Sequence, residues 1–378
     1  MTDVIRPFPD RSPRAEESSA RAGFSAGFAP MGARRLYVFG GIALIAVGML
    51  FGDIFAVFVL HQNAGRQGAA LMEACRAVAG GNPSAASQAF AGLGGLLEDR
   101  GTKVDAHVHM LGAGYLALML ALLQPYVALP QSTRKTLACL FVLGGVLLPV
   151  GIFLIHYVGL AYSPFAAIGW ASVLADAAGA LLIVVLLAQA WGFRKYLSAR
   201  QLAEPELPRE NSMPSRALSA GGAILILLGF IHGAYNAGDL LYKHEWMETA
   251  ILDRMIAAAA TNRLDAAAAE VASFGNLAGE RAVNIAAHSH VIEFGLLAML
   301  LSFVQPYVFL SDRWKQTWVK VLLGGSVVLP GFVLLELKFG LVAGGIADIG
   351  GLAVIVALIG MLVGVVRYSG RLDAEVRR

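Results

Sequence analysis

Residues 106–128 read AHVHMLGAGYLALMLALLQPYVA, and residues 287–309 read AHSHVIEFGLLAMLLSFVQPYVF. Each stretch begins with a His-x-His pair, continues as an apolar run and ends with a Gln-Pro-Tyr-Val motif, and 181 residues separate the two copies. About 20 mostly apolar residues cross a bilayer core of about 30 Å as a helix, because backbone groups in lipid must be bonded internally. The repeated stretch therefore predicts two equivalent membrane-spanning helices.

The composition of the whole chain agrees with a membrane protein. Of its 378 residues, 57% are hydrophobic and 15% are charged, whereas soluble domains have about 45–50% apolar and about 25% charged residues. These values exclude a soluble globular enzyme, and a net charge of +3 is too small for a nucleic-acid surface. Two cysteines exclude a Cys-rich metal protein. Cys75 and Cys139 fall on opposite sides of the expected membrane, so we expect no disulfide between them and an inert thiol at Cys75.

Eight segments have the length and hydropathy of membrane-spanning helices. They lack the alternating pattern of a transmembrane barrel, so the predicted fold is an all-α polytopic membrane protein. The last two segments are expected to be joined by a tight turn at Gly344-Gly345. The predicted spans cover residues 37–60, 106–128, 137–160, 165–192, 218–241, 286–310, 319–340 and 345–367.

The duplication extends over both halves of the chain and divides it into two units of four spans. An even number of spans places both units in the same direction, which predicts parallel repeats related by a pseudo-two-fold axis along the membrane normal. The predicted organisation is a disordered cytosolic tail, a first repeat, a cytosolic linker, a second repeat and a second tail. These segments cover residues 1–35, 36–196, 197–216, 217–368 and 369–378.

Basic residues predict the orientation of the chain in the membrane. One side carries 20 Lys and Arg residues and the other carries nine, mostly in the two long loops 61–104 and 242–284. Because cytoplasmic loops are enriched in Lys and Arg, both termini are predicted to be cytoplasmic, in a bacterial-type inner membrane. The two long loops, which contain Ala-rich helical patterns, are expected to form small helical caps on the outer face.

Seven of the eight histidines map to the outer side of the predicted bundle. Neutral imidazole binds heme iron, copper and zinc, and ionisable groups inside a membrane usually face a cavity, a partner or a cofactor. The two histidines of each His-x-His pair point to opposite helix faces, and those that share a face with small residues are the better inward ligands: His107 and His288. The predicted cofactor-binding residues are His107, His109, His288 and His290. The alternative is that they are interfacial histidines exposed to water.

Further side chains are candidates for binding a metal or for supporting the histidines. Glu293 lies one helical turn after His290 and can accept its second N–H or bind a metal. The candidate metal ligands are His61, His156, His244, Glu293 and Glu336. Three intramembrane carboxylates are candidates for proton relay or for hydrogen bonds to histidine, or are bonded at helix ends: Asp53, Asp176 and Asp348.

The His-x-His helices resemble those of known heme proteins. A His-x-His pair followed by an apolar helix resembles the two-histidine helix of heme-copper oxidases and nitric oxide reductases. Residues 288–295, HSHVIEFG, also resemble the HxHxxxFG helix of NnrS-type heme- and copper-containing membrane proteins. The duplicated eight-span plan is similar to heme A synthase. These resemblances imply heme b as the cofactor, with copper or zinc as the alternative.

Three functions remain open at this point. The first is a redox protein with heme b, with or without copper, near the outer face. Such a protein would pass electrons between a periplasmic donor or a quinol and an acceptor, or would handle a small ligand such as oxygen or nitric oxide. The second is a transporter or sensor for divalent copper or zinc that uses the same histidines. The third is a structural subunit of a respiratory complex. The expected partners are the lipid bilayer and, for an assembled form, a second copy or a respiratory complex, with no nucleic acid. The two His-x-His pairs are expected to converge at one depth, with at least one pair from different repeats close enough to share a ligand.

Overall fold

Eight helices of the chain are long and apolar enough to cross a membrane, and the described secondary structure is entirely helical. This computed structural model describes residues 32–56, 61–158, 170–198 and 212–368. The predictions for the two tails and the linker fall mostly on residues outside these ranges. The eight helices are α2 (Ala33–Phe55), α4 (Pro83–Leu123), α5 (Gln131–Val158), α6 (Trp170–Ser198), α7 (Met213–Tyr235), α9 (Leu264–Val304), α10 (Asp312–Phe339) and α11 (Leu341–Arg367).

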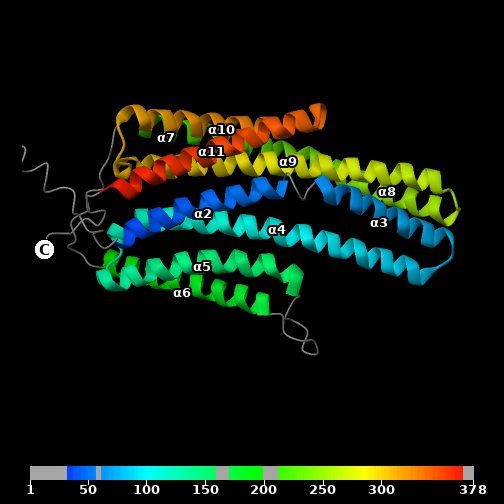
Figure 1. Cartoon of the computed structure of the whole chain (residues 1–378), viewed down its shortest axis with the longest axis horizontal. Coiled ribbons are helices and arrows are strands. Elements are labelled where there is room, and N and C mark those ends of the chain that lie inside the picture. Colours follow the sequence, from blue (N-terminus) through cyan, green and yellow to red (C-terminus); the bar gives the residue numbers. More distant parts are fainter. Residues whose placement is uncertain (1–31, 57–60, 159–169, 199–211, 369–378) are drawn as a thin grey trace, which may run out of the picture. The chain divides into compact units, whose positions relative to one another are not determined.

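Two of these helices, α4 and α9, have 41 residues each. Each one begins in a long loop of the sequence prediction and continues without a break into the following span (Figure 1). The first helix starts with Pro83 after Asn82, whose side chain accepts a hydrogen bond from the Ala85 amide. Asn is a preferred N-cap residue and Pro is favoured in the first helical turn. The two Ala-rich loops are thus helical, and the second half of each is continuous with the helix that follows as a span.

The remaining helices of these loops form a cap with the first halves of α4 and α9. Helices α3 (His61–Ala79) and α8 (Leu241–Ala260) pack on each other and on α9, and α3 also packs on α4. A separate hydrophobic cluster holds the cap together, contributed by α3, α8 and α9: Leu71, Cys75, Met255, Ala258, Ala259, Ala267 and Val271. Cys75 is therefore a buried core residue, and both described cysteines are free thiols.

Contacts within the first half of the chain recur in the second half. Helix α2 packs on α4 as α7 packs on α9, and α5 packs on α6 as α10 packs on α11. The Gln-Pro-Tyr motifs form short 3-10 helices, η3 (Gln124–Tyr126) and η5 (Gln305–Tyr307). Arg134 donates to the Gln124 carbonyl and Lys315 donates to the Gln305 carbonyl. Equivalent residues therefore make equivalent contacts at the ends of α4 and α9.

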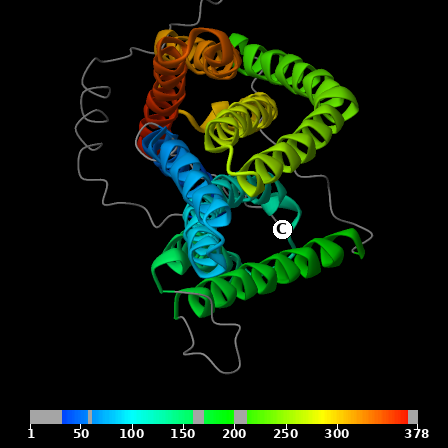
Figure 2. The same ribbon diagram turned by 90° about the vertical axis from the view of Figure 1, so that its right-hand side faces the viewer.

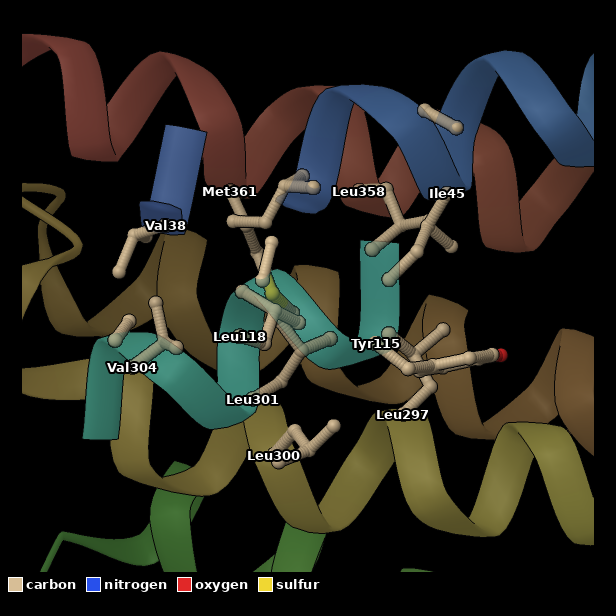
Figure 3. Close-up of a cluster of buried hydrophobic side chains, with 14 of the residues drawn as sticks. Val38, Ile45, Tyr115, Leu118, Leu297, Leu300, Leu301, Val304, Leu358 and Met361 are labelled. Carbon is tan, nitrogen blue, oxygen red and sulfur yellow. The ribbon is translucent and has the colours of Figure 1, made fainter. Parts of the chain in front are cut away.

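Among the eight membrane-spanning helices, the two halves meet through α2, α4, α9 and α11. Apolar side chains of all four helices interdigitate there, among them Val38, Leu118, Leu301 and Leu358 (Figure 3). The hydroxyl of Tyr115 on α4 donates to the backbone carbonyl of Glu293 on α9 at 3.2 Å. The two helices that carry the His-x-His pairs thus lie at the junction of the halves.

The junction is not the same on both sides. Helix α11 packs along α2, whereas α6 and α7, the equivalent pair, make no comparable contact among the described residues. Figures 1 and 2 show α11 beside α2, and Figure 1 shows α6 and α7 on opposite sides of α4 and α9. A strict two-fold rotation would form both contacts, so the predicted rotation axis stays a prediction.

The expected turn at Gly344-Gly345 is wrong in position. Helix α10 ends at Phe339, and α11 begins at Leu341 and contains both of these glycines. The turn is made by Gly340, with φ 58° and ψ −144°. This backbone conformation is essentially restricted to glycine, and it explains why the chain reverses four residues earlier than the sequence pattern suggested.

Candidate functional site

His107 on α4 is held against a glycine-lined strip of α2. Its Nδ1 lies 2.7 Å from the backbone carbonyl oxygen of Gly48. A Cβ on Gly52 would stand 2.4 Å from Cε1 of the ring, which is closer than carbon atoms can approach. The absence of a side chain at residue 52 therefore creates the seat in which the imidazole lies.

His288 on α9 has the same surroundings in the second half of the chain. Its Nδ1 lies 3.0 Å from the carbonyl oxygen of Gly229, and a Cβ on Gly233 would stand 2.3 Å from its Cε1. The ring of His232 on α7 meets the ring of His288 edge-on, with 6.1 Å between the centroids. Two equivalent histidines are thus fixed by two equivalent pairs of glycines.

These hydrogen bonds define which ring nitrogen carries the proton. A carbonyl oxygen only accepts, so Nδ1 of His107 and of His288 must donate. In the neutral imidazole Nε2 then keeps its lone pair. Metal-binding histidines usually have this arrangement, in which the second ring N–H is bonded to a backbone carbonyl or a carboxylate that fixes the tautomer and the ring. The chemistry of both seats fits a ligand for heme iron or another metal.

Sequence spacing pointed to these histidines but did not connect them with the glycines that hold them. Gly48 and Gly52 align with Gly229 and Gly233 at the same 181-residue offset as the two histidines. The shared offset is a signal that a small residue and a histidine belong to one structural unit. Their roles differ, since one glycine supplies the acceptor carbonyl and the next supplies the space.

His290 and Glu293 form a polar group on the same helix. Nδ1 of His290 lies 3.9 Å from Oε2 of Glu293, and its ring stacks on Phe294 with 5.9 Å between the centroids. Both residues are close enough to His107 for their charges to act on it. His290 and Glu293 are therefore the residues of the second half that approach the histidine seat of the first half.

Two intramembrane carboxylates lie near this group. Asp53 on α2 lies within electrostatic range of Asp348 on α11 and of His290 on α9. The Asp53 carboxylate packs on Gly351, where a Cβ would stand 2.8 Å from Oδ1. Asp176, the third carboxylate of the prediction, is exposed on α6. Sequence spacing did not connect Asp53 with the histidines, because the contact depends on how α11 packs on α2.

His109 differs from its counterpart His290. Its side chain is exposed, and Nδ1 bonds to the carbonyl oxygen of Asp105 in its own helix at 2.7 Å. Gly112 occupies the position that corresponds to Glu293. The first half thus provides one inward histidine, whereas the second half adds a polar pair. Whether the four histidines share one ligand stays a prediction.

The other candidate metal ligands are dispersed. His244 lies in the cap with Nε2 3.5 Å from Oε1 of Glu280, and Glu336 lies against Gly344 of α11. The side chains of His61 and His156 fall outside the described residues. Within the described part of the chain, no three His, Cys, Asp or Glu side chains gather as a metal-binding group. A metal role for these residues therefore stays a prediction.

Comparison of the chain with protein-family models, with curated proteins and with solved structures finds no match. The geometry of the two histidine seats is therefore the basis on which a function can be argued for this eight-helix membrane protein.

Proposed function

We propose that this chain is a heme b-binding membrane protein that passes electrons, with His107 and His288 as iron ligands. One observation carries the proposal: both histidines occur in the same glycine seat, each with Nδ1 bonded to a backbone carbonyl and Nε2 left as the ligand nitrogen. The exposed His109 also has its Nδ1 bonded to a backbone carbonyl, so the glycine seat is the feature that sets His107 and His288 apart, and its two copies favour a function that both halves keep.

The residues around the seats have separate tasks in this proposal. Gly48 and Gly229 accept the Nδ1 proton and hold each ring in its orientation. Asp53 and Glu293 place carboxylates near His107 and His290, where they balance positive charge or take up a proton. Heme b, when bound, supplies one-electron chemistry. A quinol or a periplasmic electron donor is the proposed reductant.

A second function, the binding of divalent copper or zinc, is favoured by the His290–Glu293 pair. The separation of 3.9 Å between Nδ1 and Oε2 brings two ligand types of these metals together. In this alternative His290 and Glu293 would supply two of the ligands of the metal.

The absorption spectrum of the purified protein distinguishes the two proposals. The heme proposal expects a Soret band and an α band on reduction with dithionite, and loss of heme from His107→Ala and His288→Ala. Tyr307→Phe is the matched control, because Tyr307 lies at the other end of α9 and should keep the spectrum. The metal proposal expects a protein without heme bands that carries stoichiometric copper or zinc, and expects His290→Ala to lose that metal. This outcome would contradict the heme proposal.

A further inference from the structure

The cap contains a pocket that is separate from both histidine seats. Its volume is about 230 Å³, which is smaller than the range of about 300–1,000 Å³ that is typical of ligand pockets. Residues of α4, α8 and α9 line it, so it lies where the cap joins the membrane-spanning parts of α4 and α9. Apolar lining comes from α9, with Phe274, Leu277 and Ile285, and the polar lining consists of Arg100, His244, Glu248 and Arg281.

His244 is buried in the wall of this pocket without a hydrogen-bond partner. Its side chain is 2% exposed, and neither ring nitrogen makes a hydrogen bond with a described residue. The Glu280 carboxylate is 3.5 Å from Nε2, a separation that is long for a hydrogen bond. An imidazole that is removed from water and left unbonded is costly, so a ligand in the pocket would satisfy it.

The charges of the lining favour an anion. Arg281 on α9 pairs with Glu248 on α8, with 3.3 Å between Nη1 and Oε2. Arg100 on α4 makes no hydrogen bond or ion pair with another described residue. The pocket therefore has two guanidinium groups against one lining carboxylate. The planar fork of arginine binds a carboxylate through two parallel hydrogen bonds.

We propose that this pocket binds a small monocarboxylate that carries an apolar group. The carboxylate would bond to Arg100 and to His244, and the apolar group would contact Phe274, Leu277 and Ile285. A single negative charge matches the excess of one positive charge in the lining, and the volume limits the ligand to a small molecule. The proposal does not depend on heme or on a metal at the histidine seats.

Isothermal titration calorimetry of the full chain in detergent, with sodium benzoate as the probe, tests the proposal. Benzoate has one carboxylate and one apolar ring. We expect saturable binding to the unmodified protein and a loss of affinity of about tenfold or more in Arg100→Gln, which removes a charge-assisted hydrogen bond. His244→Phe should also weaken binding, since it removes the ring nitrogens and keeps the buried volume.

The matched control is Arg66→Gln, because Arg66 is exposed on α3 of the same cap and does not line the pocket. Thermal unfolding followed by circular dichroism checks that the variants fold. Absence of benzoate binding to the folded unmodified protein, or equal weakening by Arg100→Gln and Arg66→Gln, would overturn the proposal. Inorganic phosphate that binds where benzoate does not would overturn the carboxylate assignment. Zn²⁺ bound through His244 and unaffected by Arg100→Gln would also overturn it.

Discussion

The ring of His107 occupies the space in which a side chain at residue 52 would stand. We predict that Gly52→Ala displaces the ring, and that Gly233→Ala does the same to His288. If heme is bound through these residues, each substitution should lower the heme-to-protein ratio of the purified protein. Gly324→Ala is the control, because a Cβ there meets no atom within 4 Å. Unchanged heme content in all three variants would contradict the role of the glycine seat.

Cys75 offers a test of the cap core at the residue scale. Burial raises the pKa of its thiol, and the side chain is 6% exposed. In a Cys139→Ala background we predict that iodoacetamide modifies Cys75 more slowly than a peptide thiol, because the thiolate is the nucleophile. The rate should rise with pH beyond the range in which a free thiol levels off. Protein unfolded in detergent should react at the ordinary rate.

The same shift predicts how the stability of the chain depends on pH. The folded pKa of Cys75 is above the unfolded pKa, so the unfolded chain releases the proton first as pH rises. The contribution of the neutral thiol is therefore present below the unfolded pKa, about 8.5, and is lost as pH rises through the folded pKa. Cys75→Ala should flatten this loss. For the iodoacetamide experiment, a modification rate of Cys75 equal to that of a free peptide thiol would show that the cap does not bury this side chain.

At the scale of elements, the α10–α11 connection distinguishes the observed turn from the expected one. We predict that Gly340→Ala lowers the free energy of unfolding by about 1–3 kcal/mol, because the conformation of residue 340 is strained for any other residue. Gly345→Ala should be neutral or stabilising by up to about 1 kcal/mol, since this glycine is within a helix and has open space around it. Unfolding in mixed micelles measures both. The reverse ranking would return the turn to Gly344-Gly345.

Hydropathy was sufficient to predict all eight membrane-spanning helices, but not the full length of α4 and α9. Four charged residues interrupt the apolar pattern before the first His-x-His pair: Glu98, Asp99, Arg100 and Lys103. The predicted span therefore begins only at residue 106. Most of these residues are good helix formers, so the helix continues where the lipid-facing pattern stops. Hydropathy indicates where a helix enters lipid, whereas the helix propensity of the residues determines where the helix itself begins.

The candidate site could be predicted in part. Periodicity placed His107 and His288 on the faces with small residues, and the structure places both against glycines of the neighbouring helix. It did not predict that His109 faces away from the junction or that Asp53 approaches His290. Those differences arise because α11 packs on α2 while α6 and α7 stay apart in the described residues. The hydrophobic periodicity is the same in both halves, so it cannot encode this asymmetric packing.

For the whole molecule, the unequal number of Lys and Arg residues on the two sides of the membrane predicts the topology. Alkaline phosphatase fused after Gly81, in the turn between α3 and α4, should be active outside the cytoplasm. The same enzyme fused after Tyr368 should be inactive, because 20 of the 29 basic residues belong to the side that carries both termini. A fluorescent protein, which matures in the cytoplasm, is the reciprocal control. Phosphatase activity after Tyr368 would reverse the orientation.

The unbroken run of α4 has a mechanical consequence. Its 41 residues extend over about 60 Å, and Arg100 and His107 lie two turns apart on this single rod. A stiff rod has no hinge at which a movement could be absorbed, so tilting its outer end changes the angle at which it crosses the membrane. Helix α4 therefore has the form of a lever arm, and a tilt of its outer end would be carried to the His107 ring and to its contact with the Gly48 carbonyl.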